Sequence, residues 1–475
     1  MIENGTPIRA RRTTPAARAL ALLLAGALAA ATPGPLAAPA SAQGSPTAGL
    51  PIVRDAEMEQ LLRDYLQPIL RVAGLAKQNI KVVIISDRGF NAFVMDGRHI
   101  FINAGALFDA KTPNEVIGVL AHESGHLAGG HLSRMREQLA NAQTQSIIAM
   151  LLGIGAMVAT SRSSGGGVGA GALLGPQESI RRSLLSYVRA QEDQADHAGV
   201  KFLTASGQSA KGMYDTFKRL GDEMLFNSRF IDPYVQSHPL PADRVAALEA
   251  LAKASPYWDK KDSPELQLRH DLMRAKLSGF LDRADALARR YPAGDQTLPA
   301  RYARAIATYR HADLRQAVVQ IDGLIQAQPN NPYFHELKGQ ALLEGGHPAE
   351  AVVPLRRAVQ LAPTPALIQI LLGQALIASN NPKNAEEAVA LLRAAIEREP
   401  EAPEAYAQLA MAYGRKGDLA HADLASAQAA FVRGDIKTAR QLASRAKTRL
   451  PVGSPAWVKA DDLVSVKMPG GAKTN

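Results

Sequence analysis

The stretch His122-Glu123-Ser124-Gly125-His126 decides the fold of this 475-residue chain. In a helix, residues four positions apart lie on one face, so the two imidazoles can reach the same ion. This arrangement is typical of a zinc site, and it leaves the carboxylate of Glu123 free to hold a water molecule and take its proton. The alternative is two histidines and a carboxylate on an exposed helix, because short motifs also occur by chance.

The residues before the motif indicate the start of a helix. Thr112 is a candidate N-cap, Pro113 suits the first helical position, and Glu115 is placed for a capping box. Apolar residues over 116–120 follow, so the helix is expected to enter a core. Buried histidine and glutamate side chains need a strong partner there, and a metal supplies one.

A catalytic zinc site needs a third protein ligand. A continuous helix would place His131 about half a turn around from His122, so we interpret His131 as a surface histidine. Glu192 and Asp196 are better candidates, because they stand four residues apart and share a helix face. One carboxylate can bind zinc while the other accepts a hydrogen bond from a ligand imidazole. The alternative is an ordinary solvated acidic face.

Together these motifs resemble the gluzincin family of HtpX-like and CAAX-prenyl-protease-like peptidases, whose pattern is H-E-x-x-H followed by E-x-x-A-D. Residues 192–196 read Glu-Asp-Gln-Ala-Asp and match the second element. The resemblance implies that His122, His126 and Glu192 bind one zinc ion. It also implies that Glu123 is the general base and that Asp196 supports a ligand from behind.

A third stretch, Ser237-His238-Pro239 with Arg244 downstream, is similar to the S-H-P-x-x-x-x-R element of soluble periplasmic members of this family. That similarity implies that His238 is a regulatory fourth ligand which shuts the site. It implies that Arg244 is a nearby electrostatic group. The alternative for His238 is an ordinary loop histidine before a proline.

The N-terminus has the pattern of a secretory signal peptide. A basic start is followed by a Leu/Ala-rich run over 19–31 and by the A-x-A cleavage site Ala40-Ser41-Ala42. The run is short for a membrane span. We therefore predict export to a bacterial periplasm. The absence of cysteine from the sequence excludes disulfides and a lipid anchor on a cysteine.

The distribution of charge along the chain limits the kinds of partner that we expect it to bind. The formal net charge is +10, but positive and negative residues are mixed along the chain and no basic tract is interleaved with aromatic residues. We therefore predict no nucleic-acid partner, while peripheral contact with an anionic membrane surface stays open.

Residues 52–75 have the spacing of an amphipathic helix, and residues 81–85 are strand-like. Apolar runs at 91–95 and 99–103 flank Asp96-Gly97, which predicts a hairpin. We predict that residues 99–106 form an edge strand along which a substrate peptide pairs; the alternative is a purely structural hairpin. The apolar-to-Gly segment 146–175 is either a lid that touches membrane or a buried helix followed by a loop.

The C-terminal half repeats. Its markers are spaced by 37, 34 and 37 residues, at Pro292, Pro329, Pro363 and Pro400. This is the tetratricopeptide period, and we expect units at 299–331, 332–365, 366–402 and 403–436. Such stacked helix pairs form a surface that binds other proteins. The alternative is that the repeats only stabilise the rest of the chain.

The predicted fold class is an α+β zincin-type metallopeptidase domain, mostly helical with a small sheet, followed by an all-α tetratricopeptide-repeat solenoid. We expect a signal peptide at 1–42, a metallopeptidase domain at 43–258, a linker or irregular helical repeat at 259–298, repeats at 299–450 and a tail at 451–475.

The family resemblance implies a periplasmic endopeptidase that acts on unfolded or misassembled outer-membrane proteins. It also implies that the repeats dock on the barrel-assembly machinery. Two alternatives stay open: a chaperone or scaffold for envelope proteins that rarely cleaves, and a processing protease with one dedicated substrate.

Overall fold

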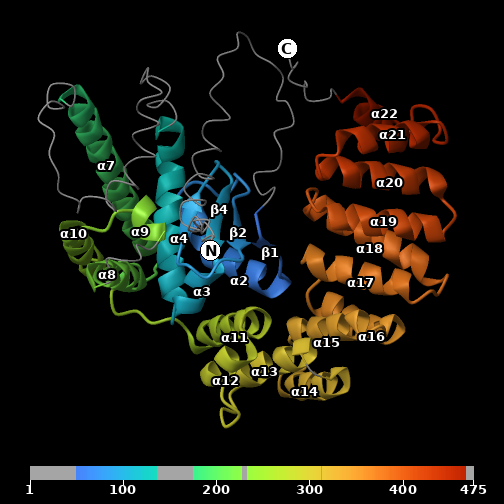
Figure 1. Ribbon diagram of the computed structural model, residues 1–475, viewed down its shortest axis with the longest axis horizontal. Helices are drawn as coiled ribbons and strands as arrows, with labels where there is room; N and C mark the ends of the chain where they lie inside the picture. Colours follow the sequence, from blue (N-terminus) through green and yellow to red (C-terminus); the bar gives the residue numbers. More distant parts are fainter. Residues whose placement is uncertain (1–49, 136–174, 227–232, 312, 467–475) are drawn as a thin grey trace, which may run out of the picture.

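The computed structural model describes residues 50–135, 175–226, 233–311 and 313–466 (Figure 1). The predicted signal peptide and nearly all of segment 146–175 lie outside these residues. Two parts follow one another along the chain, a mixed N-terminal part and a stack of helices. The structure confirms the predicted fold class.

The N-terminal part combines a small sheet with a group of helices. In chain order its elements are β1 (Ile52–Val53), α2 (Ala56–Val72), β2 (Lys81–Ile85), β3 (Ala92–Val94), β4 (His99–Asn103), α3 (Ala104–Asp109), α4 (Pro113–Gly129), α7 (Gly175–Ala205), α8 (Lys211–Phe226), α9 (Pro233–Ser237) and α10 (Ala242–Lys253).

The helix expected over 52–75 is shorter at both ends. Residues 52–53 pair with β2 as β1, and α2 starts at Ala56 because the Asp55 side chain accepts a hydrogen bond from the Met58 N–H at 2.9 Å.

The four strands lie in the order β1-β2-β4-β3, with β2 and β4 parallel and the other pairs antiparallel. The predicted hairpin joins β3 to β4, and Asp96 Oδ1 accepts hydrogen bonds from the N–H groups of Arg98 and His99 at 2.7 Å each. The prediction of an edge strand over 99–106 is wrong. β2 pairs with β4 on its other side, residues 104–106 belong to α3, and β1 and β3 are the edge strands.

Helix α4 lies inside the N-terminal core. It begins at Pro113 as predicted, but without the predicted capping box between Thr112 and Glu115. Instead, Glu115 Oε1 accepts a hydrogen bond from the Lys111 N–H at 3.1 Å, and the carboxylate of Asp262 accepts one from the Asn114 N–H at 2.9 Å. Close contact with α8 depends on Gly118, where a Cβ would lie 2.6 Å from the Met213 backbone. The motif is therefore held on a helix enclosed on several sides.

The second part continues through antiparallel helices that stack on one another (Figure 1). They are α11 (Pro264–Leu281), α12 (Ala284–Arg290), α13 (Leu298–His311), α14 (Leu314–Ala327), α15 (Pro332–Glu344), α16 (Pro348–Leu361), α17 (Ala366–Ala378), α18 (Asn384–Arg398), α19 (Pro403–Arg415), α20 (Leu419–Val432), α21 (Ile436–Lys447) and α22 (Pro455–Ser465).

Each expected repeat unit contains one helix pair, from α13–α14 to α19–α20. Gly339 and Gly373 occupy equivalent places, because a Cβ at either would press into the leucine of the paired helix, Leu355 or Leu392. The expected tail is partly helical: Ser454 caps α22, which packs on α21. The signal for this helix was Ser454 followed by Pro455.

The stack returns to the N-terminal part through α2. Ala56 packs with Ala358 and Ile368 in one apolar cluster, and Lys81 Nζ lies 3.2 Å from Glu399 Oε2. Within the described ranges, no helix combines the length and the apolar character that crossing a membrane requires.

Candidate metal centre

Helix α4 brings two imidazoles of the motif together, as their spacing predicts. His122 is fully buried, His126 is 7% exposed, and their Nε2 atoms lie 3.0 Å apart. His122 also packs its ring edge-on against Phe217 of α8, with ring centroids 5.1 Å apart. The pair is therefore fixed inside the protein and is not part of an exposed helix face.

Helix α7 supplies two carboxylates to the same place. Glu192 Oε2 lies 3.4 Å from His122 Nε2, and Glu192 Oε1 lies 3.4 Å from His126 Nε2. Asp196 Oδ1 lies 3.0 Å from the other nitrogen of His122, Nδ1. The helices come this close because Gly125 has no side chain: a Cβ there would lie 2.8 Å from the Ala195 carbonyl oxygen.

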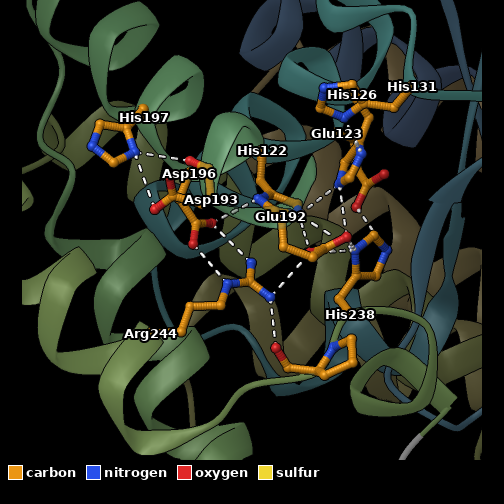
Figure 2. Close-up of polar contacts among 11 residues, drawn as sticks. His122, Glu123, His126, His131, Glu192, Asp193, Asp196, His197, His238 and Arg244 are labelled. Atoms are coloured by element: carbon orange, nitrogen blue, oxygen red, sulfur yellow. Dashed lines mark hydrogen bonds and ion pairs between the residues drawn. The ribbon is translucent and has the colours of Figure 1, made fainter. Parts of the chain in front are cut away.

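His238 comes from the turn after α9 and completes the group (Figure 2). Its Nδ1 lies 3.0 Å from Glu192 Oε2 and 3.4 Å from His122 Nε2. Its ring stacks on Tyr234, with centroids 4.6 Å apart and planes inclined by 28°. His238 is therefore a buried member of the cluster.

The four donors fit a tetrahedral ion. One ligand atom each from His122, His126, Glu192 and His238 lies within 4.8 Å of the other three. With zinc–ligand distances of about 2.0 to 2.1 Å, neighbouring donors of a tetrahedral site lie about 3.3 to 3.4 Å apart. The pairs named above lie 3.0 to 3.4 Å apart, close to that spacing, with Glu192 offering Oε2 to His122 and His238 and Oε1 to His126. Nitrogen and carboxylate oxygen are also the ligands that zinc takes.

Glu123 differs from the other carboxylates. It is fully buried, and neither carboxylate oxygen has a hydrogen-bond partner among the described residues. The Nε2 atom of His238 lies 3.7 Å from Glu123 Oε1, beyond hydrogen-bond distance. Burial raises the pKa of Glu123. Burying a carboxylate without hydrogen-bond partners is costly unless water or another group binds it. The position of Glu123 beside the four donors therefore indicates a chemical role.

Arg244 of α10 balances the acidic groups (Figure 2). Its Nε and Nη2 donate to Asp196 at 2.7 and 2.9 Å, and Nη1 lies 3.0 Å from Glu192 Oε2. Burial alone would raise the pKa of both carboxyl groups, but His238 and His122 outweigh it and lower the pKa of Glu192, and Arg244 and His122 lower that of Asp196. Both carboxylates are therefore held ionised.

The same acidic groups act on His122. Burial alone would lower its pKa, but Asp196 and Glu192 outweigh burial and raise it to about 9. The surroundings of His122 thus favour positive charge, which a proton or a metal cation can supply.

The interpretation of His131 as a surface residue is wrong. It is only 3% exposed, and its Nδ1 lies 2.9 Å from His126 Nδ1. The interpretation assumed a continuous helix, whereas α4 ends at Gly129 and Gly130 adopts a left-handed conformation with φ of 63°. The Gly129-Gly130 pair was the available signal, since glycine commonly ends a helix this way. Phe217 was also missed, because an aromatic residue on an apolar helix face carries no distinguishing mark.

Residues 55–252 match the model of peptidase family M48. The chain therefore carries a peptidase family M48 domain. Zinc is the metal of this metalloprotease family, and the donors described above fit it.

Curated relatives extend the similarity. The beta-barrel assembly-enhancing protease of Yersinia pestis is 23% identical over 419 residues, which cover 87% of this chain and 84% of that protein. The Escherichia coli protein of the same name is 22% identical over 311 residues, 65% of this chain. The chain spans less than two thirds of that relative, 63% of its length.

Among solved structures, the crystal structure of MamA is 20% identical and covers 34% of this chain and 89% of its own, with a TM-score of 0.28. A similarity this low adds nothing to the argument about function.

Proposed function

We propose that this chain is a zinc-dependent endopeptidase in which His122, His126 and Glu192 hold the metal. The observation that carries the proposal is the buried group of four donors next to the carboxylate of Glu123, which has no hydrogen-bond partner among the described residues. The M48 domain and the metalloprotease names of the relatives support the same chemistry.

When bound, zinc supplies Lewis-acid chemistry, which activates a water molecule and polarises the carbonyl of the scissile peptide. Glu123 takes the proton of the attacking water and delivers it to the nitrogen of the leaving amine. Its raised pKa suits a group that must accept a proton before returning it. Asp196 holds Nδ1 of His122, which directs Nε2 of that ring toward the metal.

His238 is proposed as a regulatory fourth ligand in the resting enzyme. Its Nδ1 lies among the donors, in the position that water or substrate must occupy during catalysis. Arg244 supports this state from both sides, because it pairs with Glu192 and also donates to the carbonyl oxygen of Pro239, next to His238. Movement of the turn after α9 would free the position for substrate.

The repeats are proposed to bind other proteins. The names of the relatives lead us to propose misassembled outer-membrane proteins as substrates, the barrel-assembly machinery as the docking partner of α13–α21, and the periplasm as the compartment. A chaperone that rarely cleaves is less well supported, because such a protein has no need of a buried Glu123 whose oxygens lack a hydrogen-bond partner among the described residues. A protease with one dedicated substrate would use the same site.

The test is Glu123→Gln in the purified chain, with β-casein as an unstructured substrate and metal content measured in parallel. We expect one zinc per chain in both forms, and a loss of cleavage of about 10²- to 10⁴-fold in the variant, the usual contribution of a general base. Glu115→Gln is the matched control, because Glu115 lies on the same helix but pairs with Arg219 away from the donors. Undiminished cleavage by the Glu123 variant, or wild-type chain without zinc, would refute the proposal.

A further inference from the structure

The ring of His131 touches the metal centre from behind. Its Nδ1 lies 2.9 Å from Nδ1 of His126, and the two rings meet edge-on with centroids 4.9 Å apart at 84° (Figure 2). His131 is not one of the four clustered donors, so it does not reach the ion itself. Its contact is with the nitrogen of His126 that faces away from the metal.

The end of α4 is shaped to make this contact. The left-handed Gly130 turns the chain back, so that the next residue returns over the last turn of the helix. The ring then occupies the space beside Gly129, where a Cβ would collide with it. The carbonyl oxygen of His131 accepts a hydrogen bond from the Gln191 side chain at 3.4 Å, which ties it to the residue before Glu192.

The proton between the two rings can be placed by elimination. Nε2 of His126 faces His122 and Glu192, and it can bind a cation only when it carries no proton. The proton of a neutral His126 ring is therefore on Nδ1, and its acceptor at 2.9 Å is Nδ1 of His131. His131 must then carry its own proton on Nε2.

We propose that His131 is a positioning residue that accepts the Nδ1 proton of His126 and fixes that ring, in one tautomer, with Nε2 toward the metal. Asp196 does the same for His122 at 3.0 Å, so each imidazole of the H-E-x-x-H motif has one acceptor behind it. Such acceptors raise metal affinity about 10- to 100-fold. The inference rests on the proposed zinc site, but it concerns a residue outside the H-E-x-x-H and E-x-x-A-D motifs.

The experiment measures the zinc dissociation constant by competition with a chelator, in the whole chain carrying Glu123→Gln so that self-cleavage cannot interfere. His131→Asn places an amide oxygen close to the position of Nδ1 and should retain most of the affinity. His131→Gln has the same functional group one bond farther out, and it should weaken zinc binding about 10- to 100-fold. Melting temperatures of the zinc-free forms show whether each variant is folded.

A second variant perturbs the contact without changing the imidazole. In Gly129→Ala the new methyl group must displace the His131 ring, so zinc binding should weaken in the same direction. Combining it with His131→Gln should add little, because both changes remove one hydrogen bond.

Equal zinc affinity in the wild-type, Asn and Gln forms would overturn the inference while leaving the proposed function intact. Equal weakening by Asn and Gln, together with equally lowered melting temperatures, would also overturn it, because the role would then be structural. If the parent chain takes up no zinc, the proposed function itself fails.

Discussion

His270 of α11 joins the repeat part to the N-terminal part, and its protonation should control that junction. It is fully buried, with Nδ1 3.1 Å from the Tyr65 hydroxyl of α2 and Nε2 3.0 Å from the Ala110 carbonyl oxygen. Because the carbonyl can only accept, Nε2 carries the proton and Nδ1 accepts from Tyr65. Both nitrogens of the neutral ring are satisfied, so a second proton has no favourable place.

The size of the effect follows from the pKa. Burial lowers the pKa of His270 from 6.5 to about 4. The unfolded chain therefore binds a proton at a higher pH than the folded chain, and stability is full above pH 6.5 and is lost as the pH falls toward 4. At about 1.4 kcal/mol for each tenfold change in proton affinity, His270 alone should remove about 2 kcal/mol between pH 7.5 and pH 5.

The assay compares wild type with His270→Gln, whose amide can still donate to Ala110 but cannot become charged. Urea unfolding is followed by the fluorescence of Trp258, which packs against the N-terminal core, after Trp457 of α22 has been changed to Phe. Every other titrating group is common to both chains and cancels. Wild type should lose about 2 kcal/mol more than the variant between the two pH values. Equal losses would show that His270 is not held neutral and that the reasoning fails.

Three further outcomes are expected. His238→Ala should raise β-casein cleavage several-fold with zinc still bound, and an unchanged or lower rate would show that His238 does not restrain the enzyme. Arg244→Gln leaves Asp196 buried without its guanidinium partner and should lower the free energy of unfolding at pH 7.5 by about 3 to 5 kcal/mol; a urea titration showing less than 1 kcal/mol would contradict this. Lys276→Met removes the cation at the junction of α2, α11 and α15, where burial raises the pKa of Glu336. Because a protonated Glu336 no longer needs a cation, the destabilisation caused by this change should shrink as the pH falls. Circular-dichroism melts that give the same loss of stability at every pH would refute this.

The fold was largely predictable because its signals are local. The period of the prolines gave the helix pairs of the repeats, and Asp96-Gly97 gave the hairpin between β3 and β4. The order of the sheet was not predictable in the same way. Either apolar strand, 81–85 or 99–103, can be a central or an edge strand, and only the pairings of the folded sheet, β1 with β2, β2 with β4 and β3 with β4, make both of them central.

The residues of the site also differ in how far their positions could be predicted from local sequence. His122, Glu123 and His126 share one helix, so their spacing alone places them together. Glu192 is brought to them by packing that no local pattern describes, and its assignment depended on family resemblance. His131 was misplaced by the assumption that α4 continues through Gly130, where a left-handed glycine ends the helix. The error therefore concerned where the helix stops, and the Gly129-Gly130 pair was the signal that could have located that end.

The two variable positions of the motif explain how distant segments form one centre. Ser124 bonds back to the Leu120 carbonyl oxygen at 2.7 Å, whereas Gly125 is the surface on which α7 rests, with room for no Cβ beside Ala195. Since Ala195 lies between Glu192 and Asp196 in the sequence, this contact fixes the position of both carboxylates along α4, next to His122 and His126. His238 is 46 residues beyond Glu192 and bonds to that carboxylate on α7, while Tyr234, Val235 and Leu240 beside it are buried in the N-terminal core. The proposed zinc ligands on α4 and α7 are thus positioned by helix packing, and the turn that carries the fourth donor is anchored in the core on both sides of His238. Because His238 lies on neither α4 nor α7, its proposed release would leave the helices that carry the other three donors in place.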